Sequence, residues 1–235
     1  MGKIKNILRR MVYGNLPETS EQFVDRMRAM GMRIGQRTIF FDPASCTIDV
    51  SRPWLIEIGD DVQITHGVTI LTHGYDWSVM KGMDGRVLGS AGKVTVGNNV
   101  FIGMNTTILK GVTVGNNVVI GAGSLVNKDI PDNCVAAGNP VRVIMPIEEY
   151  YEKRKAAQEA EAKQLVAEYR KVYGKEPDEE ALSEFFWLFT DDPDTLHPSW
   201  QSKMELVGTE KMSREMLKKN PKPYRDMQDF LDHCK

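Results

Sequence analysis

Residues 96–128 read VGNNVFIGMNTTILKGVTVGNNVVIGAGSLVNK and repeat with a period of six residues. Every sixth position carries a branched aliphatic residue: Val96, Ile102, Ile108, Val114, Ile120 and Val126. An α-helix repeats every 3.6 residues and a strand every two, so neither explains this period. A short fixed repeat is typical of a solenoid, in which each repeat forms one flat face and its branched residue points inward. The pattern predicts a parallel β-helix with three hexapeptides in each triangular coil.

The same stride of six continues toward the N-terminus. Its inward positions are Ile34, Phe40, Cys46, Arg52, Ile58, Ile64 and Ile70. Only Arg52 breaks the apolar series, and its neighbours Pro53 and Trp54 predict a bulge or a loosened corner there. Cys46 is expected to pack in the core. The β-helix is therefore predicted to cover residues 34–146.

The phase of the repeat is lost after Ile70 and returns only at Val96. The interruption covers residues 71–93, LTHGYDWSVMKGMDGRVLGSAGK. It contains His73, Tyr75, Asp76 and Trp77. A long loop that leaves a rigid scaffold and is rich in aromatic and ionisable residues is typical of a functional loop.

Residues 1–33 are expected to form a helical cap over the open end of the solenoid. The sequence TSEQ at residues 19–22 predicts a capping box that starts a helix. Phe23, Met27 and Met30 then fall on one face, and Gly31 is a plausible stop.

Residues 147–235 are expected to form a helical extension. The charged segment that follows Ile147 predicts a long helix that Gly174 and Pro177 end. A second helix is predicted over residues 178–189, and a short last helix over residues 223–234. The apolar cluster of the second helix is expected to pack against the solenoid or a neighbouring subunit.

Composition narrows the classes of function. The chain has 235 residues and a formal net charge of −2, which does not favour nucleic acid or an anionic membrane as partner. Its three cysteines argue against a disulfide scaffold and fit a reducing compartment. The apolar run near the N-terminus is too short for a signal peptide, and no run of about 18 apolar residues predicts a membrane span. A cytoplasmic protein is expected.

Residues 34–144 resemble the hexapeptide-repeat acyltransferases, most closely the O-acetyltransferases of the maltose, galactoside and capsular-polysaccharide type. The resemblance rests on IGDDVQITHGVTILTH at residues 58–73 and on the repeats of residues 94–144. Its most specific part is AGNPVRVI at residues 137–144. It implies a left-handed β-helix, acetyl-CoA as co-substrate without a required metal, and a homotrimer with active sites between subunits.

The resemblance places the catalytic histidine at His73, directly after Thr72. A neutral imidazole can take the proton that an acceptor hydroxyl loses as it attacks a thioester. His66 is a weaker alternative for this role and a candidate for the acceptor site. Asp76 is a candidate for orienting the imidazole, and Trp77 and Tyr75 either stack on a sugar or pack the loop.

The remaining candidates come from the same matching. Ser45 stands where the family often has the asparagine that holds the acceptor, so a different hydroxyl is expected to be contacted. The positions expected to bind acetyl-CoA are Gly103, Met104, Gly121, Ala122, Asn127, Lys128 and Arg142. Small residues leave backbone groups open to the pantetheine amides, and the cations suit the phosphates.

Several functions remain open from the sequence. The main hypothesis is transfer of an acetyl group to a hydroxyl of a sugar or polysaccharide precursor. N-acetylation of an amino sugar or a xenobiotic is possible on the same fold, because the fold does not choose the acceptor. A γ-carbonic-anhydrase-like enzyme needs three histidines on zinc, but the solenoid region has only His66 and His73. A non-catalytic solenoid is the last alternative.

Overall fold

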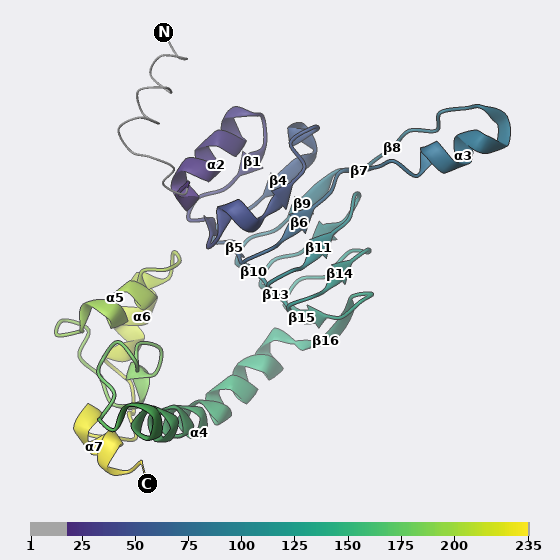
Figure 1. Cartoon of the computed structure of the whole chain (residues 1–235). Helices are drawn as coiled ribbons and strands as arrows, with labels where there is room; N and C mark the ends of the chain where they lie inside the picture. Colours follow the sequence, from purple (N-terminus) through teal and green to yellow (C-terminus); the bar gives the residue numbers. More distant parts are fainter. Residues whose placement is uncertain (1–17, 235) are drawn as a thin grey trace. The chain divides into compact units, whose positions relative to one another are not determined.

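The computed structural model describes residues 18–234 of the chain (Figure 1). It divides into two compact units, Met1–Ile147 and Glu148–Lys235. The predicted boundary between solenoid and extension, between residues 146 and 147, lies one residue before this division.

Three parallel sheets build the first unit. The first sheet contains β1 (Arg33–Ile34), β4 (Ile56–Ile58), β9 (Val94–Val96) and β12 (Thr113–Val114). The second contains β2 (Ile39–Phe40), β5 (Gln63–Ile64), β10 (Val100–Ile102), β13 (Val118–Ile120), β15 (Cys134–Ala137) and the antiparallel edge strand β16 (Arg142–Pro146). The third contains β3 (Thr47–Ile48), β6 (Thr69–Ile70), β11 (Thr107–Ile108) and β14 (Leu125–Val126). The chain visits the sheets in this order, coil after coil, as the stack in Figure 1 shows. The predicted hexapeptide β-helix is confirmed, and its handedness stays a prediction of the resemblance.

The core of the solenoid is the column of inward aliphatic residues. The six residues that define the repeat, from Val96 to Val126, are at most 1% exposed. Ile102 of β10 pairs with Ile120 of β13, so that one coil contains three hexapeptides. The branched side chains of successive coils therefore lie above one another and exclude water from the centre.

The first coil departs from the predicted stride. Its inward residue on the third sheet is Ile48, whereas Cys46 is only partly buried and Arg52 is not in the core. Two 3₁₀ turns, η1 (Pro43–Ser45) and η2 (Pro53–Leu55), lengthen this coil to four hexapeptides, so that Phe40 of β2 pairs with Ile64 of β5. Because the extra length equals one hexapeptide, the six-residue period is again in phase at Ile58. The irregularity is therefore not visible in the period of the sequence.

A ladder of polar side chains holds the first corner, which joins the first and second sheets. The Oδ1 atoms of Asp60, Asn98, Asn116 and Asp132 accept the backbone N–H groups of Gln36, Asp60, Asn98 and Asn116 at 2.6, 2.8, 2.9 and 2.7 Å. The following residues Arg37, Asp61, Asn99, Asn117 and Asn133 all have φ between 54° and 57°. Asparagine tolerates this left-handed conformation better than most residues. The asparagines of this corner therefore have a structural role.

Helix α2 (Ser20–Ala29) covers the N-terminal end of the solenoid. Thr19 and Gln22 form the predicted capping box. Phe23 and Met27 are buried, but Met30 is 40% exposed because the helix has already ended. Residues 1–17 of the predicted cap lie outside the described residues.

The interruption of the repeat forms an arm rather than an irregular loop. Strands β7 (His73–Gly74) and β8 (Ser90–Ala91) form an antiparallel pair at its base, and helix α3 (Trp77–Asp84) lies beyond them. The arm extends away from the solenoid in Figure 1. None of the residues of α3 is buried.

The second unit has its own helical core. It contains most of α4 (Ile147–Tyr173), the 3₁₀ turn η3 (Phe186–Leu188), α5 (Pro198–Met204), α6 (Glu210–Leu217) and α7 (Met227–Asp232). Helix α4 and its end before Gly174 confirm the prediction. The helix predicted over residues 178–189 is wrong, since this segment forms turns that bury Phe186, Leu188 and Phe189. Helices α5 and α6 were not predicted. The aromatic cluster packs within its own unit, with the rings of Phe186 and Trp200 stacked at 5.7 Å.

The corner ladder predicts a specific loss of stability. Asn116→Ala removes the acceptor of the Asn98 N–H and is expected to lower the free energy of unfolding by about 1–3 kcal/mol. Urea-induced unfolding without ligand measures this difference. Asn127→Ala is the matched control, because Asn127 is exposed and has no hydrogen-bond partner within residues 18–234. Equal losses in the two variants would contradict a structural role of the ladder.

Candidate active site

The third corner, where the chain passes from the third sheet back to the first, carries the predicted base. In the first coil this corner follows β3 and holds Asp49 and Ser51. In the second coil it follows β6 and holds Thr72 and His73, where the arm begins. Asp49 and His73 are far apart in the sequence, but the added hexapeptide of the first coil brings their side chains into contact.

Asp49 accepts hydrogen bonds from five donors. Its Oδ1 atom accepts from the Ser51 N–H at 3.0 Å and from the Ser51 hydroxyl at 2.6 Å. Its Oδ2 atom accepts from the Thr72 N–H at 3.1 Å, from the Thr72 hydroxyl and from Nδ1 of His73. Burial opposes ionisation of this carboxyl, but the hydrogen bonds from Ser51, Thr72 and His73 outweigh it and hold the pKa of Asp49 well below its usual range.

The contact with Asp49 fixes the state of the His73 imidazole. Nδ1 of His73 lies 2.6 Å from Oδ2 of Asp49, and the two side chains are 16% and 5% exposed. Because an ionised carboxylate only accepts, Nδ1 must carry the hydrogen. In the neutral ring Nε2 is then unprotonated, and within the described part of the chain it has no hydrogen-bond partner. This nitrogen can accept a proton from a bound acceptor.

The other predicted residues of the arm lie next to His73 in the sequence. The Tyr75 ring makes an edge contact with the imidazole at 5.1 Å between centroids, and the Trp77 ring lies 6.0 Å beyond Tyr75. Asp76 is exposed at the start of α3, and a Cβ atom built on Gly74 would meet its Oδ1 at 2.6 Å. The residue that orients the imidazole is Asp49, in the role for which Asp76 was the candidate.

Ser45 and His66 lie at the second corner, which joins the second and third sheets. Nδ1 of His66 lies 2.7 Å from Oδ2 of Asp42, and this contact lowers the pKa of Asp42. The Ser45 hydroxyl donates to the Asp42 carbonyl at 2.8 Å and accepts from the Gly67 N–H at 2.9 Å. In each coil, a strand of the third sheet lies between this second corner and the third corner, where His73 is located in the second coil. The structure therefore does not join Ser45 or His66 to His73 within one chain.

Most of the residues expected to bind acetyl-CoA line the same second corner. Gly103 and Met104 follow β10, and Gly121 and Ala122 follow β13 one coil further on. The Gly123 N–H donates to the Met104 carbonyl at 2.7 Å, which holds the two turns together. A Cβ atom on Gly103 would lie 2.5 Å from the Ala122 nitrogen, so glycine is required for this close approach.

The cationic residues expected to bind acetyl-CoA lie at two different corners. Arg142 begins β16 beside Ala137 of the second corner, whereas Asn127 and Lys128 follow β14 at the third. Lys128 and Arg142 are exposed, and neither pairs with a carboxylate of residues 18–234. Lys110 follows β11 at the third corner, between the coils of His73 and Lys128, and was not among the predicted residues.

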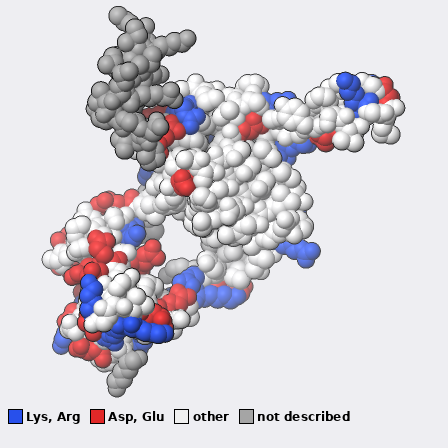
Figure 2. All heavy atoms as spheres, viewed as in Figure 1, with Lys and Arg blue, Asp and Glu red and all other residues white. Residues whose placement is uncertain are grey.

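The third sheet connects the two corners with an uncharged surface. Its outward residues are Thr47, Thr69, Thr107 and Leu125. The face of the solenoid that is turned to the viewer in Figure 2 likewise carries almost no charged side chains. An uncharged strip between two corners with cations suits an elongated ligand with a neutral middle and anionic groups.

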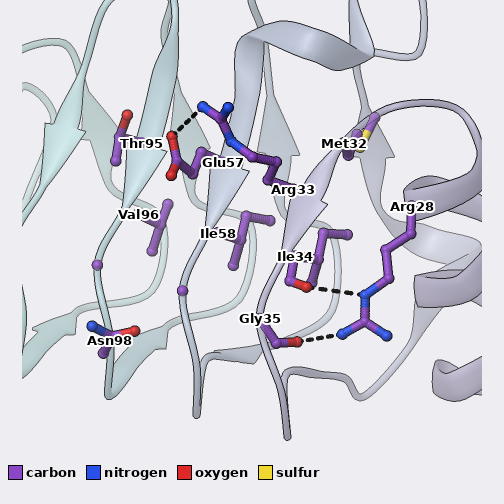
Figure 3. Close-up of a pocket in the computed structure, with 12 residues that line it drawn as sticks. Arg28, Met32, Arg33, Ile34, Gly35, Glu57, Ile58, Thr95, Val96 and Asn98 are labelled. Atoms are coloured by element: carbon purple, nitrogen blue, oxygen red, sulfur yellow. Dashed lines mark hydrogen bonds and ion pairs between the residues drawn. The ribbon is translucent and has the colours of Figure 1, made fainter.

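A hollow on the outer face of the first sheet contains none of the residues predicted to bind acetyl-CoA or the acceptor, or to act in catalysis. Arg28 donates to the carbonyls of Ile34 and Gly35 there, and Arg33 pairs with Glu57 at 2.6 Å, as Figure 3 shows. The Arg28 contacts hold α2 on the end of the solenoid, and the Arg33–Glu57 pair joins β1 to β4. We therefore assign this hollow a structural role.

Two further observations concern metals and membranes. Residues 18–234 contain no group of three histidine, cysteine, aspartate or glutamate side chains placed to hold a metal ion. No helix in the same range is long and apolar enough to cross a membrane.

Comparison with known proteins agrees with this architecture. A family model described as "Bacterial transferase hexapeptide (six repeats)" matches residues 93–128. Protein CapG of Staphylococcus aureus is 41% identical over 148 residues, which cover 63% of this chain and 81% of that protein. The putative acetyltransferase YvoF of Bacillus subtilis (strain 168) is 38% identical over 128 residues, 54% of this chain and 68% of that protein.

A sugar-modifying enzyme is also related. Galactoside O-acetyltransferase of Escherichia coli (strain K12) is 41% identical over 104 residues, 44% of this chain and 50% of that enzyme. Three observations indicate the same family: the identity with CapG and YvoF over most of their length, the match of the family model to the repeats, and the stacked parallel sheets. The chain belongs to the hexapeptide-repeat acetyltransferase family.

Proposed function

We propose that the chain transfers the acetyl group of acetyl-CoA to a hydroxyl of a sugar or polysaccharide precursor, with His73 as general base. The observation that carries the proposal is the contact between His73 and the buried, ionised Asp49. It selects the tautomer that leaves Nε2 free to accept a proton. The kinship with a galactoside O-acetyltransferase supports a sugar hydroxyl as acceptor.

The proposed reaction needs one base and no covalent intermediate on the protein. Nε2 of His73 takes the proton of the acceptor hydroxyl while its oxygen attacks the thioester carbonyl carbon. The tetrahedral intermediate collapses, the carbon–sulfur bond breaks, and the imidazolium returns the proton to the leaving thiolate. Asp49 remains ionised and stabilises the imidazolium that forms between these two steps. The products are the acetyl ester and CoA.

The proposed path of acetyl-CoA follows the second corner and the third sheet. Gly103, Met104, Gly121 and Ala122 offer a narrow backbone surface to the pantetheine arm. Arg142 and Lys128 supply cations for the phosphates, and Asn127 adds a polar side chain beside Lys128. The arrangement is consistent with the resemblance that pointed to these residues.

The acceptor site is proposed to include Ser45, His66, Asp76 and Trp77. Asp76 and Trp77 lie in the arm beside the base, whereas Ser45 and His66 occupy the opposite corner of the same chain. A homotrimer with active sites between subunits would allow residues from opposite corners of two chains to meet. N-acetylation of an amino sugar is the second candidate function, because the same free Nε2 can accept a proton from an attacking amine.

The base is tested with a CoA-release assay against sugars, nucleotide sugars and amino sugars. His73→Ala is expected to lower kcat by about 10²- to 10⁴-fold on the best acceptor, because the proton of the hydroxyl loses its acceptor. His233→Ala is the matched control, since His233 is an exposed residue of the second unit. Equal turnover by wild type and His73→Ala would exclude His73 as base.

The role of Asp49 has two readouts. Asp49→Asn is expected to lower kcat by about 10²- to 10⁴-fold, because the amide no longer enforces the productive tautomer. The low pKa of Asp49 in the folded chain also adds stability above the unfolded-state pKa of about 3.9, which is lost as the pH falls toward the folded-state value. Urea unfolding at pH 6 and pH 3 should therefore show a smaller acid-induced loss in Asp49→Asn than in wild type. Unchanged kcat together with an unchanged acid-induced loss would contradict this assignment.

The phosphate contacts predict a change in KM. Lys128→Ala and Arg142→Ala are each expected to raise the KM for acetyl-CoA by about tenfold with little change in kcat, because each removes one charge-assisted contact. The effect should shrink at high ionic strength. Lys175→Ala, an exposed lysine of the second unit, is the control, and an equal effect of all three substitutions would argue against a specific site.

A further inference from the structure

Tyr75 presents an exposed aromatic ring directly beside the proposed base. The centroids of the Tyr75 and His73 rings are 5.1 Å apart, and the ring planes meet at 77°. Tyr75 is 69% exposed, whereas the His73 side chain is 16% exposed. A ligand that approaches the imidazole from solvent therefore finds an open apolar ring next to it.

The backbone holds this ring in place. Gly74 pairs with Ser90 in the two-stranded base of the arm, and the Tyr75 carbonyl accepts the Ser78 N–H at 3.0 Å. Tyr75 thus stands between a strand pair and the first turn of α3. The Trp77 ring lies 6.0 Å away at an angle of 49° and extends the aromatic surface.

Packing against residues 18–234 does not account for the exposed ring of Tyr75. Its hydroxyl has no hydrogen-bond partner within residues 18–234, and its ring contacts there are to His73 and Trp77. Buried aromatic rings are normally covered by several neighbours, and a tyrosine hydroxyl usually finds a partner when it is buried. An open ring beside an oriented base instead resembles the lining of a ligand site.

A sugar ring complements such a surface. One face of a pyranose exposes mainly C–H groups, while its rim carries the hydroxyls. An aromatic ring can cover the C–H face through dispersion and leave the rim free for the imidazole. An open-chain polyol with the same hydroxyls has no preformed flat face to offer.

We propose that Tyr75 is the specificity-determining residue of the acceptor site and selects a ring-shaped acceptor, a pyranose, by stacking on its C–H face so that one hydroxyl reaches Nε2 of His73. The inference rests on the proposed function and adds the class of acceptor and the residue that recognises it. Tyr75 takes no part in proton transfer. Because stacking is equally strong in the ground state and the transition state, its loss should appear in KM rather than in kcat.

The experiment compares wild type with Tyr75→Ala and Tyr75→Phe on a panel of methyl glycopyranosides and the corresponding open-chain alditols. Tyr151→Ala is the matched control, because Tyr151 is a 62% exposed tyrosine of the second unit. Tyr75→Ala is expected to raise the KM for the best pyranoside by about three- to tenfold. The KM for the alditol, the KM for acetyl-CoA and the pH dependence of kcat should not change, and Tyr75→Phe should behave as wild type.

Other results would overturn the proposal. Equal KM changes for pyranoside and alditol would show that the ring is not recognised. A shifted pH dependence of kcat in Tyr75→Ala would instead show that Tyr75 acts on His73, and a changed oligomeric mass that it packs against another copy of the chain.

A binding measurement separates this inference from the proposed function. Saturation-transfer NMR with the same pyranosides and CoA reports on stacking even if no acetyl transfer occurs. Loss of the signals of the C–H face in Tyr75→Ala, without turnover in wild type, would support the acceptor site while the proposed transfer fails. If wild type binds none of the pyranosides, the inference about Tyr75 is wrong.

Discussion

The registration of one coil on the next is the constraint on which the rest of the structure depends. Each strand of the solenoid has only two to five residues, too few to hold its place alone. The hydrogen bonds of the first corner fix the registration of the coils, since side-chain oxygens of one coil accept backbone N–H groups of the coil before it. A Cβ atom on Gly97 would lie 2.6 Å from the Gly115 carbonyl oxygen, so the backbones approach closely there. Every outward residue then occupies a fixed position on its face.

The regular coils and the irregular ones have different roles. The coils of three hexapeptides repeat the inward aliphatic column and the glycine turns of the second corner, which form the flat surface proposed for acetyl-CoA. The first coil is longer, and its extra residues lie at the second and third corners. The second coil carries the arm at the third corner. The proposed base therefore lies where two irregular coils are stacked.

The six-residue period predicted the fold because inward burial leaves a direct signature in the sequence. It could not predict the first coil, where the turns around Pro43 and Pro53 add one hexapeptide in total and restore the phase. The same irregularity explains why Asp49 was missed. In a regular coil of three hexapeptides, Leu55 would lie against His73, whereas the lengthened first coil pairs Ile48 with Ile70 and brings the Asp49 side chain within hydrogen-bond distance of His73.

Other parts of the chain lacked such a signature. The turns of residues 178–189 bury consecutive aromatic residues on several sides, a pattern that also suits a buried helix. The contact of Tyr75 with His73 depends on the strand pair at the base of the arm, whose two strands are too short for a periodic signal. What the sequence predicted well was a repeated feature, and what it missed depends on single contacts between distant residues.

The location of Asp49 also explains why an ionised carboxylate is tolerated next to a sealed core. An inward position of a regular coil offers only aliphatic neighbours, and burying a charge there would cost several kcal/mol. The third corner of the lengthened first coil instead provides the hydroxyl and the backbone N–H of Ser51, and the next coil adds the hydroxyl and the backbone N–H of Thr72. Arg52 donates to the Ser90 carbonyl at 3.4 Å and so connects the same corner to the base of the arm. The irregularities that interrupt the repeat are therefore what allow a buried anion to orient the proposed base at the edge of a hydrophobic solenoid.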